Sequence, residues 1–240
     1  MPIYENREYI NVIRELPQFV ERDICEIPFI EKNDIDISDI NNGKWLVSIP
    51  NLSVKDNLSN KKIVQSFKSD DVLRREYYNM PCFLKKVSNY EIVSSFDFTI
   101  DKKMDFPSVL SAVYSNRWSG AFVQANGKKA IATVGWIGEK YIDICLAGLR
   151  DGAVFLISTI GCNNRESIGD FVFGYNEMRK RFPNSRLICV GNKLECIDSD
   201  VIMVSYKDSF GWWNRKNGFW QPSFLDAYGN VIEGGEKDVI

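Results

Sequence analysis

The 240-residue chain contains no histidine. This absence excludes Ser-His-Asp and Cys-His catalysis, zinc sites that use histidine, and nucleases with a histidine base. An excess of charge of one sign is also missing, because 30 basic and 32 acidic residues give a net charge of −2. Such a balance does not indicate a large nucleic-acid or membrane surface.

Long apolar runs are missing as well. A membrane-spanning helix needs roughly 20 apolar residues, and the longest apolar run, near residues 153–160, contains Ser158 and Thr159. The first twenty residues lack the basic start and apolar core of a secretory signal. Six cysteines occur without a CxxC pair, which is typical of reduced thiols. We therefore expect a cytoplasmic protein with no membrane contact.

Phosphate-binding loops are absent, since neither GxxxxGK nor GxGxxG occurs, and no cysteine spacing fits a thiolate metal site. The remaining pattern is one of alternating apolar runs and helical stripes. It predicts strands at 24–30, 44–49, 62–67, 92–98, 130–134, 153–160, 186–190 and 201–205, and helices at 6–16, 70–80, 107–125 and 169–182. Residues 33–43 are acidic and polar and are predicted to form a loop.

Most of the predicted strands are continuous apolar runs, which is typical of parallel strands buried on both faces. Alternating strands and helices predict right-handed βαβ units. We therefore expect an α/β fold with a mainly parallel sheet, as an irregular or incomplete (β/α) barrel rather than an open doubly wound sheet. No helix is predicted between strands 44–49 and 62–67, which argues against an ideal barrel. Residues 1–205 are predicted to form this single domain, with the N-terminal helix and acidic loop in 1–43. An aromatic-rich segment and tail follow at 206–240.

Both folds place ligands at the C-terminal ends of parallel strands, so the residues that follow the strands should meet at one edge. Carboxylates there can act as acid and base or bind Mg²⁺. The sequence does not define a set of ligands for this ion. The predicted catalytic residues are Asp97, Asp71, Glu139 and Cys162. The predicted ligand-binding residues are Trp136, Thr159, Asn163 and Asn192.

Each of these residues also has a structural interpretation. Asp71 is more often a helix cap, and a tryptophan at a strand end, such as Trp136, more often packs than binds. A helix N-terminus and Arg165 would lower the pKa of Cys162, but an unreactive cysteine that fills a tight turn is the commoner case. For Asp97, which interrupts an apolar strand end, a structural role and a functional role are about equally supported.

The segment from Phe210 to Trp220 mixes aromatic and basic residues. Such a mixture can stack on bases, dock a partner protein or plug one end of a barrel. The residues predicted to contact a nucleic acid or a host protein are Trp212, Trp213, Arg215, Lys216 and Trp220.

The central stretch resembles a known family. The similarity rests on Phe67 with Asp71, Ser95-Phe96-Asp97-Phe98-Thr99, Phe106-Pro107, Tyr114, Arg117, Gly120, Gln124, Gly127, Trp136, Gly148, Gly161-Cys162 and Gly191. Over residues 60–192 the chain is similar to the DUF4417 family of phages, mobile elements and bacteria. The resemblance implies phage or mobile-element biology, and the host cytoplasm if the chain is phage-encoded, but no activity. The chain departs from the family pattern at Phe96 and Thr99, at Ser115 and at Ala147.

Arg117, Gly120 and Gln124 share one face of the predicted helix at 107–125. We interpret this face as packing on the sheet, with Arg117 pointing away from the strand ends, or alternatively as a second site on the opposite side.

Three functions stay open. The first is an enzyme acting on a nucleotide, a sugar or a nucleic-acid phosphate, and the second is a non-catalytic phage protein that binds nucleic acid or a host protein. The third is a family member that retains only the scaffold.

Overall fold

The computed structural model describes residues 15–40, 45–53, 55–206 and 209, together with 224–225 and 231–232. One sheet is built from the strands β1 (Trp45–Ser48), β2 (Lys62–Gln65), β3 (Ile92–Ser94), β4 (Lys129–Thr133), β5 (Val154–Ser158), β6 (Arg186–Val190) and β7 (Ile202–Val204). The helices are α2 (Asp70–Tyr77), α3 (Met80–Lys86), α4 (Phe106–Ala125), α5 (Ile142–Cys145) and α6 (Arg165–Arg181). Short 3-10 turns are η2 (Ser38–Ile40), η3 (Ile49–Asn51) and η4 (Ser59–Lys61), and β8 (Phe224–Leu225) pairs antiparallel with β9 (Val231–Ile232).

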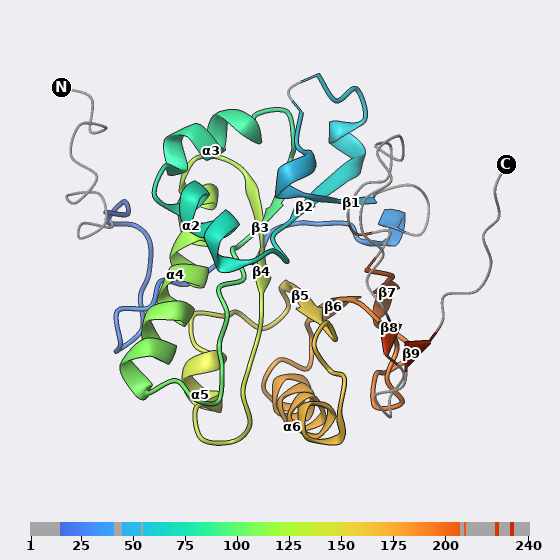
Figure 1. Cartoon of the computed structure of the whole chain (residues 1–240). Coiled ribbons are helices and arrows are strands. Elements are labelled where there is room, and N and C mark those ends of the chain that lie inside the picture. The colour runs from blue at the N-terminus through green and yellow to red at the C-terminus, as the bar shows by residue number, and fades with distance from the viewer. Residues whose placement is uncertain are drawn as a thin grey trace, which may run out of the picture.

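All seven strands of the main sheet run parallel, and their spatial order is the same as their order in the chain (Figure 1). A doubly wound sheet would reverse its order at a switch point, whereas a (β/α) barrel would not. Within the described part of the chain no ladder joins β7 back to β1, so the sheet is a curled half-barrel. The predicted α/β fold with an incomplete barrel is confirmed, and η3 and η4 replace a helix between β1 and β2.

The two faces of the sheet carry different apolar clusters. The outer face packs under the helices with alternate residues such as Val64, Val93 and Phe155. The inner face is formed by the intervening residues, among them Ile63 and Leu156. Because every second residue points to each face, continuous apolar strands are required to fill both clusters.

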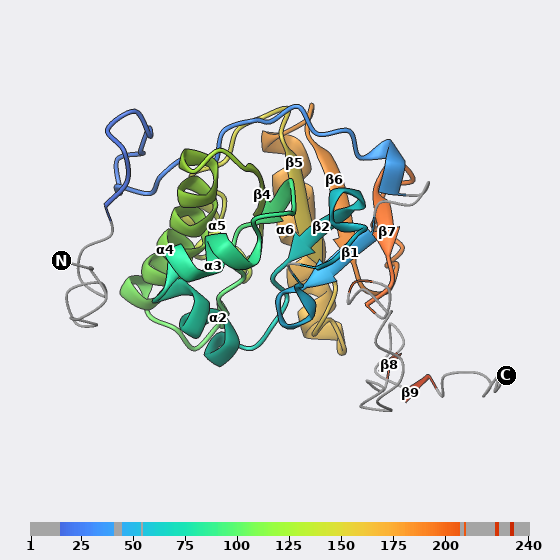
Figure 2. The ribbon, with the colours of Figure 1, turned by 90° about the horizontal axis from the view of Figure 1, so that it is seen from above.

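An irregular segment, residues 27–40, covers part of the inner face, and we call it the N-terminal strap. Figure 2 shows it in blue, running along the molecule from beside α4 to η2. Its isoleucines Ile35, Ile37 and Ile40 are buried in the inner cluster. The predicted loop at 33–43 is confirmed over its described residues, yet its isoleucines contribute to the core.

The strap is held at its start by helix α4. The Gln124 side chain donates to the Glu31 carbonyl at 2.7 Å and accepts from the Glu31 N–H at 3.0 Å. A Cβ at Gly120 would lie only 2.3 Å from the Ile30 side chain, so glycine permits the close approach. The shared face of α4 is therefore a packing surface, as predicted, and the strap is one of its partners.

The strap is then held along the N-terminal ends of two strands. Asn33 donates its amide to the Ala130 carbonyl on β4 at 2.8 Å, and Arg186 on β6 donates to the Ile35 carbonyl. These bonds place the strap across the end of the sheet opposite the predicted site.

Two predicted elements differ from the structure. Residues 24–30 form no strand, because the Asp23 carboxylate takes the N–H groups of Cys25 and Ile27 and Glu26 has a φ of 60°. The helix predicted at 70–80 is instead divided, because α2 ends at Tyr77 and Pro81 lies in the first turn of α3, where the missing N–H of proline costs nothing. The helix predicted at 6–16 lies almost wholly outside the described residues.

We predict that Gly148→Ala lowers the free energy of unfolding by about 2 kcal/mol or more. Gly148 has a φ of 70°, and a Cβ there would lie 2.7 Å from the Pro28 carbonyl oxygen of the strap. The matched control is Gly127→Ala, with a φ of 80° and no atom within 4 Å of the new Cβ, which should cost only about 1 kcal/mol of backbone strain. Urea unfolding measures both, and equal losses would contradict the role of the strap contact.

Candidate functional site

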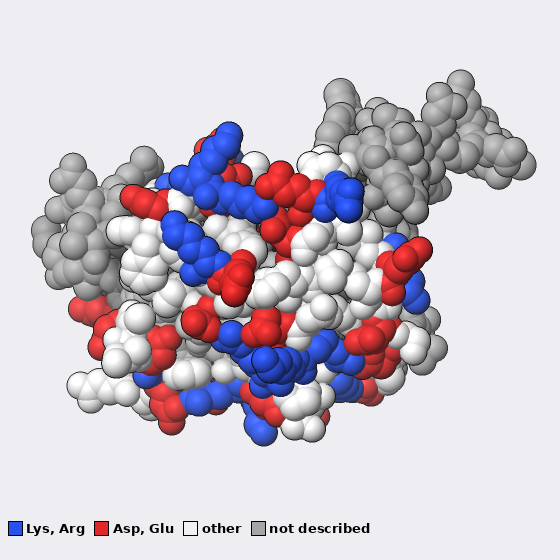
Figure 3. Space-filling model, turned by 90° about the horizontal axis from the view of Figure 1, so that it is seen from below, with Lys and Arg blue, Asp and Glu red and all other residues white. Residues whose placement is uncertain are grey.

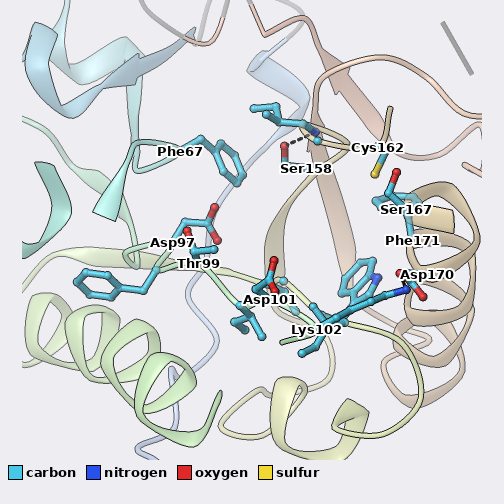
Figure 4. A pocket seen from close by; sticks show the side chains of 18 of the residues that line it. Phe67, Asp97, Thr99, Asp101, Lys102, Ser158, Cys162, Ser167, Asp170 and Phe171 are labelled. Atoms are coloured by element: carbon cyan, nitrogen blue, oxygen red, sulfur yellow. Dashed lines mark hydrogen bonds and ion pairs between the residues drawn. The ribbon is translucent and has the colours of Figure 1, made fainter. Parts of the chain in front are cut away.

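A cavity of about 1030 Å³ opens at the C-terminal ends of β2, β3, β4 and β5 (Figure 4). Residues from the loops after these strands line it, together with the start of α6 and Tyr206 after β7. Parallel strands in sequential order bring these loops to one edge, as in a (β/α) barrel. In Figure 4, Asp97 and Phe67 lie on one side of the cavity, and Cys162, Ser167 and Asp170 lie on the other.

Asp97 lies three residues after β3, on backbone that α4 holds in place. The Phe96 N–H donates to Ser119 Oγ at 2.8 Å, and the Phe98 N–H donates to Asn116 Oδ1 at 2.7 Å. Both donors flank Asp97, so its side chain is directed into the cavity, where it is partly exposed. Gly135, at the end of β4, would bring a Cβ to 3.9 Å from Asp97 Oδ1.

The proton affinity of Asp97 is unusual. Burial and, to a smaller extent, the negative charge of Asp70 raise the pKa of Asp97, whereas Arg117 lowers it; the net pKa is about 7. A carboxyl of this kind holds both protonation states near neutral pH, as a general acid–base requires.

Arg117 lies below the cavity and is buried. Its guanidinium donates to the carbonyl oxygens of Ala147 at 2.8 Å, Thr133 at 2.9 Å and Cys145 at 2.7 Å. It therefore joins α4 to the end of β4 and to α5. Arg117 does not point away from the strand ends as predicted, because its long side chain reaches back to the last residue of β4.

Three lysines line the cavity: Lys68, Lys102 and Lys103. Burial lowers the pKa of Lys68 to about 8. Lys102 pairs with Glu166 at 2.8 Å and with Asp170 at 2.5 Å, so it ties the loop after β3 to helix α6. These acidic partners neutralise Lys102, and the cavity is therefore not strongly cationic.

The structure brings together only some of the predicted site residues. Asp97, Trp136 and Cys162 line the cavity. Thr159 is buried and donates to the Asn192 carbonyl at 2.8 Å, so these two join the ends of β5 and β6 outside the lining. Asp71, Glu139 and Asn163 are exposed and lie outside the lining.

Cys162 does not have the lowered pKa that its place before α6 predicted. Burial raises the pKa of Cys162 to about 11, and Cys196 and Asp170 add to the rise. A thiol of this kind is protonated at neutral pH and is a poor nucleophile. In addition, no group of three or more acidic or cysteine side chains within the described residues is arranged to hold a metal ion.

Sequence reasoning missed Lys68 and Lys102, and of the adjacent Asp70 and Asp71 it did not select Asp70 for the site. It preferred Asp71, but α2 begins at Asp70, and this register turns Asp70 toward Thr99 and leaves Asp71 exposed. Serine is a common helix N-cap, so Ser69 was the sequence signal that the helix begins at Asp70. The predicted contact residues Trp212, Trp213, Arg215, Lys216 and Trp220 all lie outside the described part of the chain.

Comparison with known proteins adds the family. A family model described as "Domain of unknown function (DUF4417)" matches residues 21–207, which is more than half of the chain. The chain belongs to the DUF4417 family. Two curated relatives are the Gene 1 proteins of Mycobacterium phages L5 and D29, which are 28% and 27% identical over 121 residues.

The chain spans about half the length of these relatives, 52% of the L5 protein and 44% of the D29 protein, and each match covers 50% of the chain. The resemblance to the DUF4417 family is thus confirmed, and the relatives support its phage setting. No solved structure matches the chain significantly. None of the helices that the structure describes is long and apolar enough to cross a membrane.

Nine of the DUF4417 residues quoted above form two groups. Arg117, Gly120, Gln124 and Gly148 hold the strap and the framework beneath the cavity. A second group, Phe67, Asp97, Thr99, Trp136 and Cys162, lines the cavity.

We predict that the stability of the chain depends on pH through Asp97. Below pH 4 the carboxyl is protonated in both the folded and the unfolded state, and as pH rises toward 7 only the folded state keeps the proton. The free energy of unfolding should therefore fall between pH 4 and pH 8, and Asp97→Asn should remove up to about 4 kcal/mol of this fall. Denaturant unfolding at both pH values measures it, with Asp71→Asn as the exposed control. Parallel pH profiles of wild type and Asp97→Asn would contradict the prediction.

Proposed function

We propose that the cavity binds a nucleoside or nucleotide and that Asp97 is the general acid–base of a reaction on it. The observation that carries the proposal is a carboxyl with a pKa of about 7 in a cavity at the C-terminal strand ends. Loops at this edge carry the active sites of (β/α) barrels, although this likeness of fold is an analogy.

The aromatic lining favours a ligand with a planar ring. Phe67 and Tyr206 belong to the inner apolar cluster at one side of the cavity. Trp136 lines it from the loop after β4 and Phe171 from α6, with ring centroids 5.5 Å apart. A flat base can stack on either pair, while Asp97 accepts or donates hydrogen bonds at the edge of the ring.

Size and charge narrow the ligand further. A volume of about 1030 Å³ is enough for a nucleotide. Three lysines and four carboxyl groups line the cavity, and Glu166 and Asp170 neutralise Lys102, so the lining has no excess of positive charge for a chain of phosphates. We therefore favour a nucleoside or a monophosphate over a triphosphate or a nucleic-acid backbone.

Calorimetric titration with nucleosides, mono- and triphosphates and sugars tests this proposal. A nucleoside or monophosphate should bind, and Asp97→Asn should weaken its affinity at least about tenfold, the value of one charged hydrogen bond. Asp71→Asn, an exposed charge change nearby, should leave the affinity unchanged. Absence of binding by the whole panel, or equal affinities of wild type and Asp97→Asn, would overturn the proposal.

The second function, partner binding through the segment from Phe210 to Trp220, stays a prediction. The face in Figure 3 carries Lys, Arg, Asp and Glu interspersed rather than gathered by sign, which does not favour a nucleic-acid footprint there. The carbonyl oxygen of Ser209, the last described residue before the segment, accepts a 2.9 Å bond from the Gln65 side chain at the end of β2.

We predict that a chain ending at Ser209 loses any salt-sensitive binding to DNA that the full chain has, because phosphate contacts release counterions. Gel-shift titrations at low and moderate salt measure this. Undiminished binding by the shortened chain would exclude the segment as the binding surface.

A further inference from the structure

Asp70, the first residue of α2, reaches across to the loop that follows Asp97. Its Oδ1 accepts from the Thr99 N–H at 3.0 Å and from Thr99 Oγ1 at 2.9 Å. Its Oδ2 lies 3.8 Å from Arg74, one turn along the same helix. Two donors from one residue on one carboxylate oxygen fix the position of the loop relative to α2.

Three side chains hold the backbone on either side of Asp97. Ser119 and Asn116 of α4 hold its neighbours Phe96 and Phe98, and Asp70 holds Thr99. The first two groups are neutral, whereas Asp70 is charged. Asp70 is therefore the one of these three holders that can also act on Asp97 electrostatically.

The charged groups around Asp97 come from several elements. Asp70 on α2 and Arg117 on α4 are those whose charge acts on it, in opposite directions. Lys68 before α2, Asp101, Lys102 and Lys103 on the loop after β3, and Glu166 and Asp170 on α6 line the same cavity. Arg117 is held by hydrogen bonds to three carbonyl oxygens, so its charge cannot be removed without breaking them. Asp70 is therefore the charge to substitute.

We propose that Asp70 is the positioning residue of this site: it fixes the loop after Asp97 through its two hydrogen bonds to Thr99, and it brings a second carboxylate to the loop that carries Asp97. The negative charge of Asp70 adds to the burial that favours the protonated form of Asp97. The inference rests on the proposed role of Asp97 for its catalytic meaning. Its structural and electrostatic content can be tested without any ligand.

The substitutions separate the two roles. Asp70→Asn keeps an oxygen that can accept from Thr99 but removes the charge, and Asp70→Ala removes both. Asp71→Asn is the matched control, because it removes the same charge from the same helical turn at an exposed position.

The readout is the ¹³C chemical shift of the Asp97 carboxyl group during a pH titration of the full chain. The signal is assigned to Asp97 because it is missing from the spectrum of Asp97→Asn. Wild type should titrate near pH 7. Asp70→Asn should lower the midpoint by roughly one pH unit, and Asp71→Asn should leave it in place. Hydrogen exchange of the Thr99 N–H should accelerate in Asp70→Ala and stay slow in Asp70→Asn.

Two outcomes would overturn the inference: an unchanged midpoint in Asp70→Asn, or an equal fall in Asp71→Asn. The proposed function fails differently, by the absence of ligand binding, and that result leaves the titration of Asp97 untouched. A midpoint that falls in Asp70→Asn while no ligand binds would therefore support the electrostatic role alone.

Discussion

A parallel sheet that curls without closing leaves an apolar inner face, and this face must be covered. In a complete barrel the opposite strands would fill the interior with their own side chains. Here the isoleucines of the N-terminal strap, Ile35, Ile37 and Ile40, fill part of that interior instead. Bonds from Asn33 to β4 and from Arg186 to the strap fix it at the N-terminal ends of the strands. The C-terminal ends are thereby the open side, where the cavity forms.

The same framework explains why several residues of the family pattern have a structural role. Arg117 donates to three carbonyl oxygens, and the loss of these charged hydrogen bonds would be costly. Gly120 and Gly148 let the strap lie against α4 and the loop after α5. With these residues assigned to the framework, the pattern leaves Asp97 and its surroundings, to which we assign the proposed chemistry.

Sequence reasoning could predict the sheet, because apolar runs such as 153–160 and 186–190 need burial on both faces. It could also place Asp97 at the strand ends, since a carboxylate that interrupts an apolar run must be compensated. It could not choose between Asp70 and Asp71, because one residue of helical register decides which of them faces Thr99. Nor could it predict that burial would raise the pKa of Cys162, since the depth of a turn depends on packing from α6 and Cys196.

The strap also constrains when the fold can be completed during synthesis. Glu31 meets Gln124 at a separation of 93 residues, and Ile35 meets Arg186 at a separation of 151. The earliest described part of the chain must therefore wait for β6 to leave the ribosome, roughly ten seconds or more at ordinary elongation rates. Until then its isoleucines and the inside of the nascent sheet are both exposed, so this interval is when the chain is most open to aggregation and to chaperones.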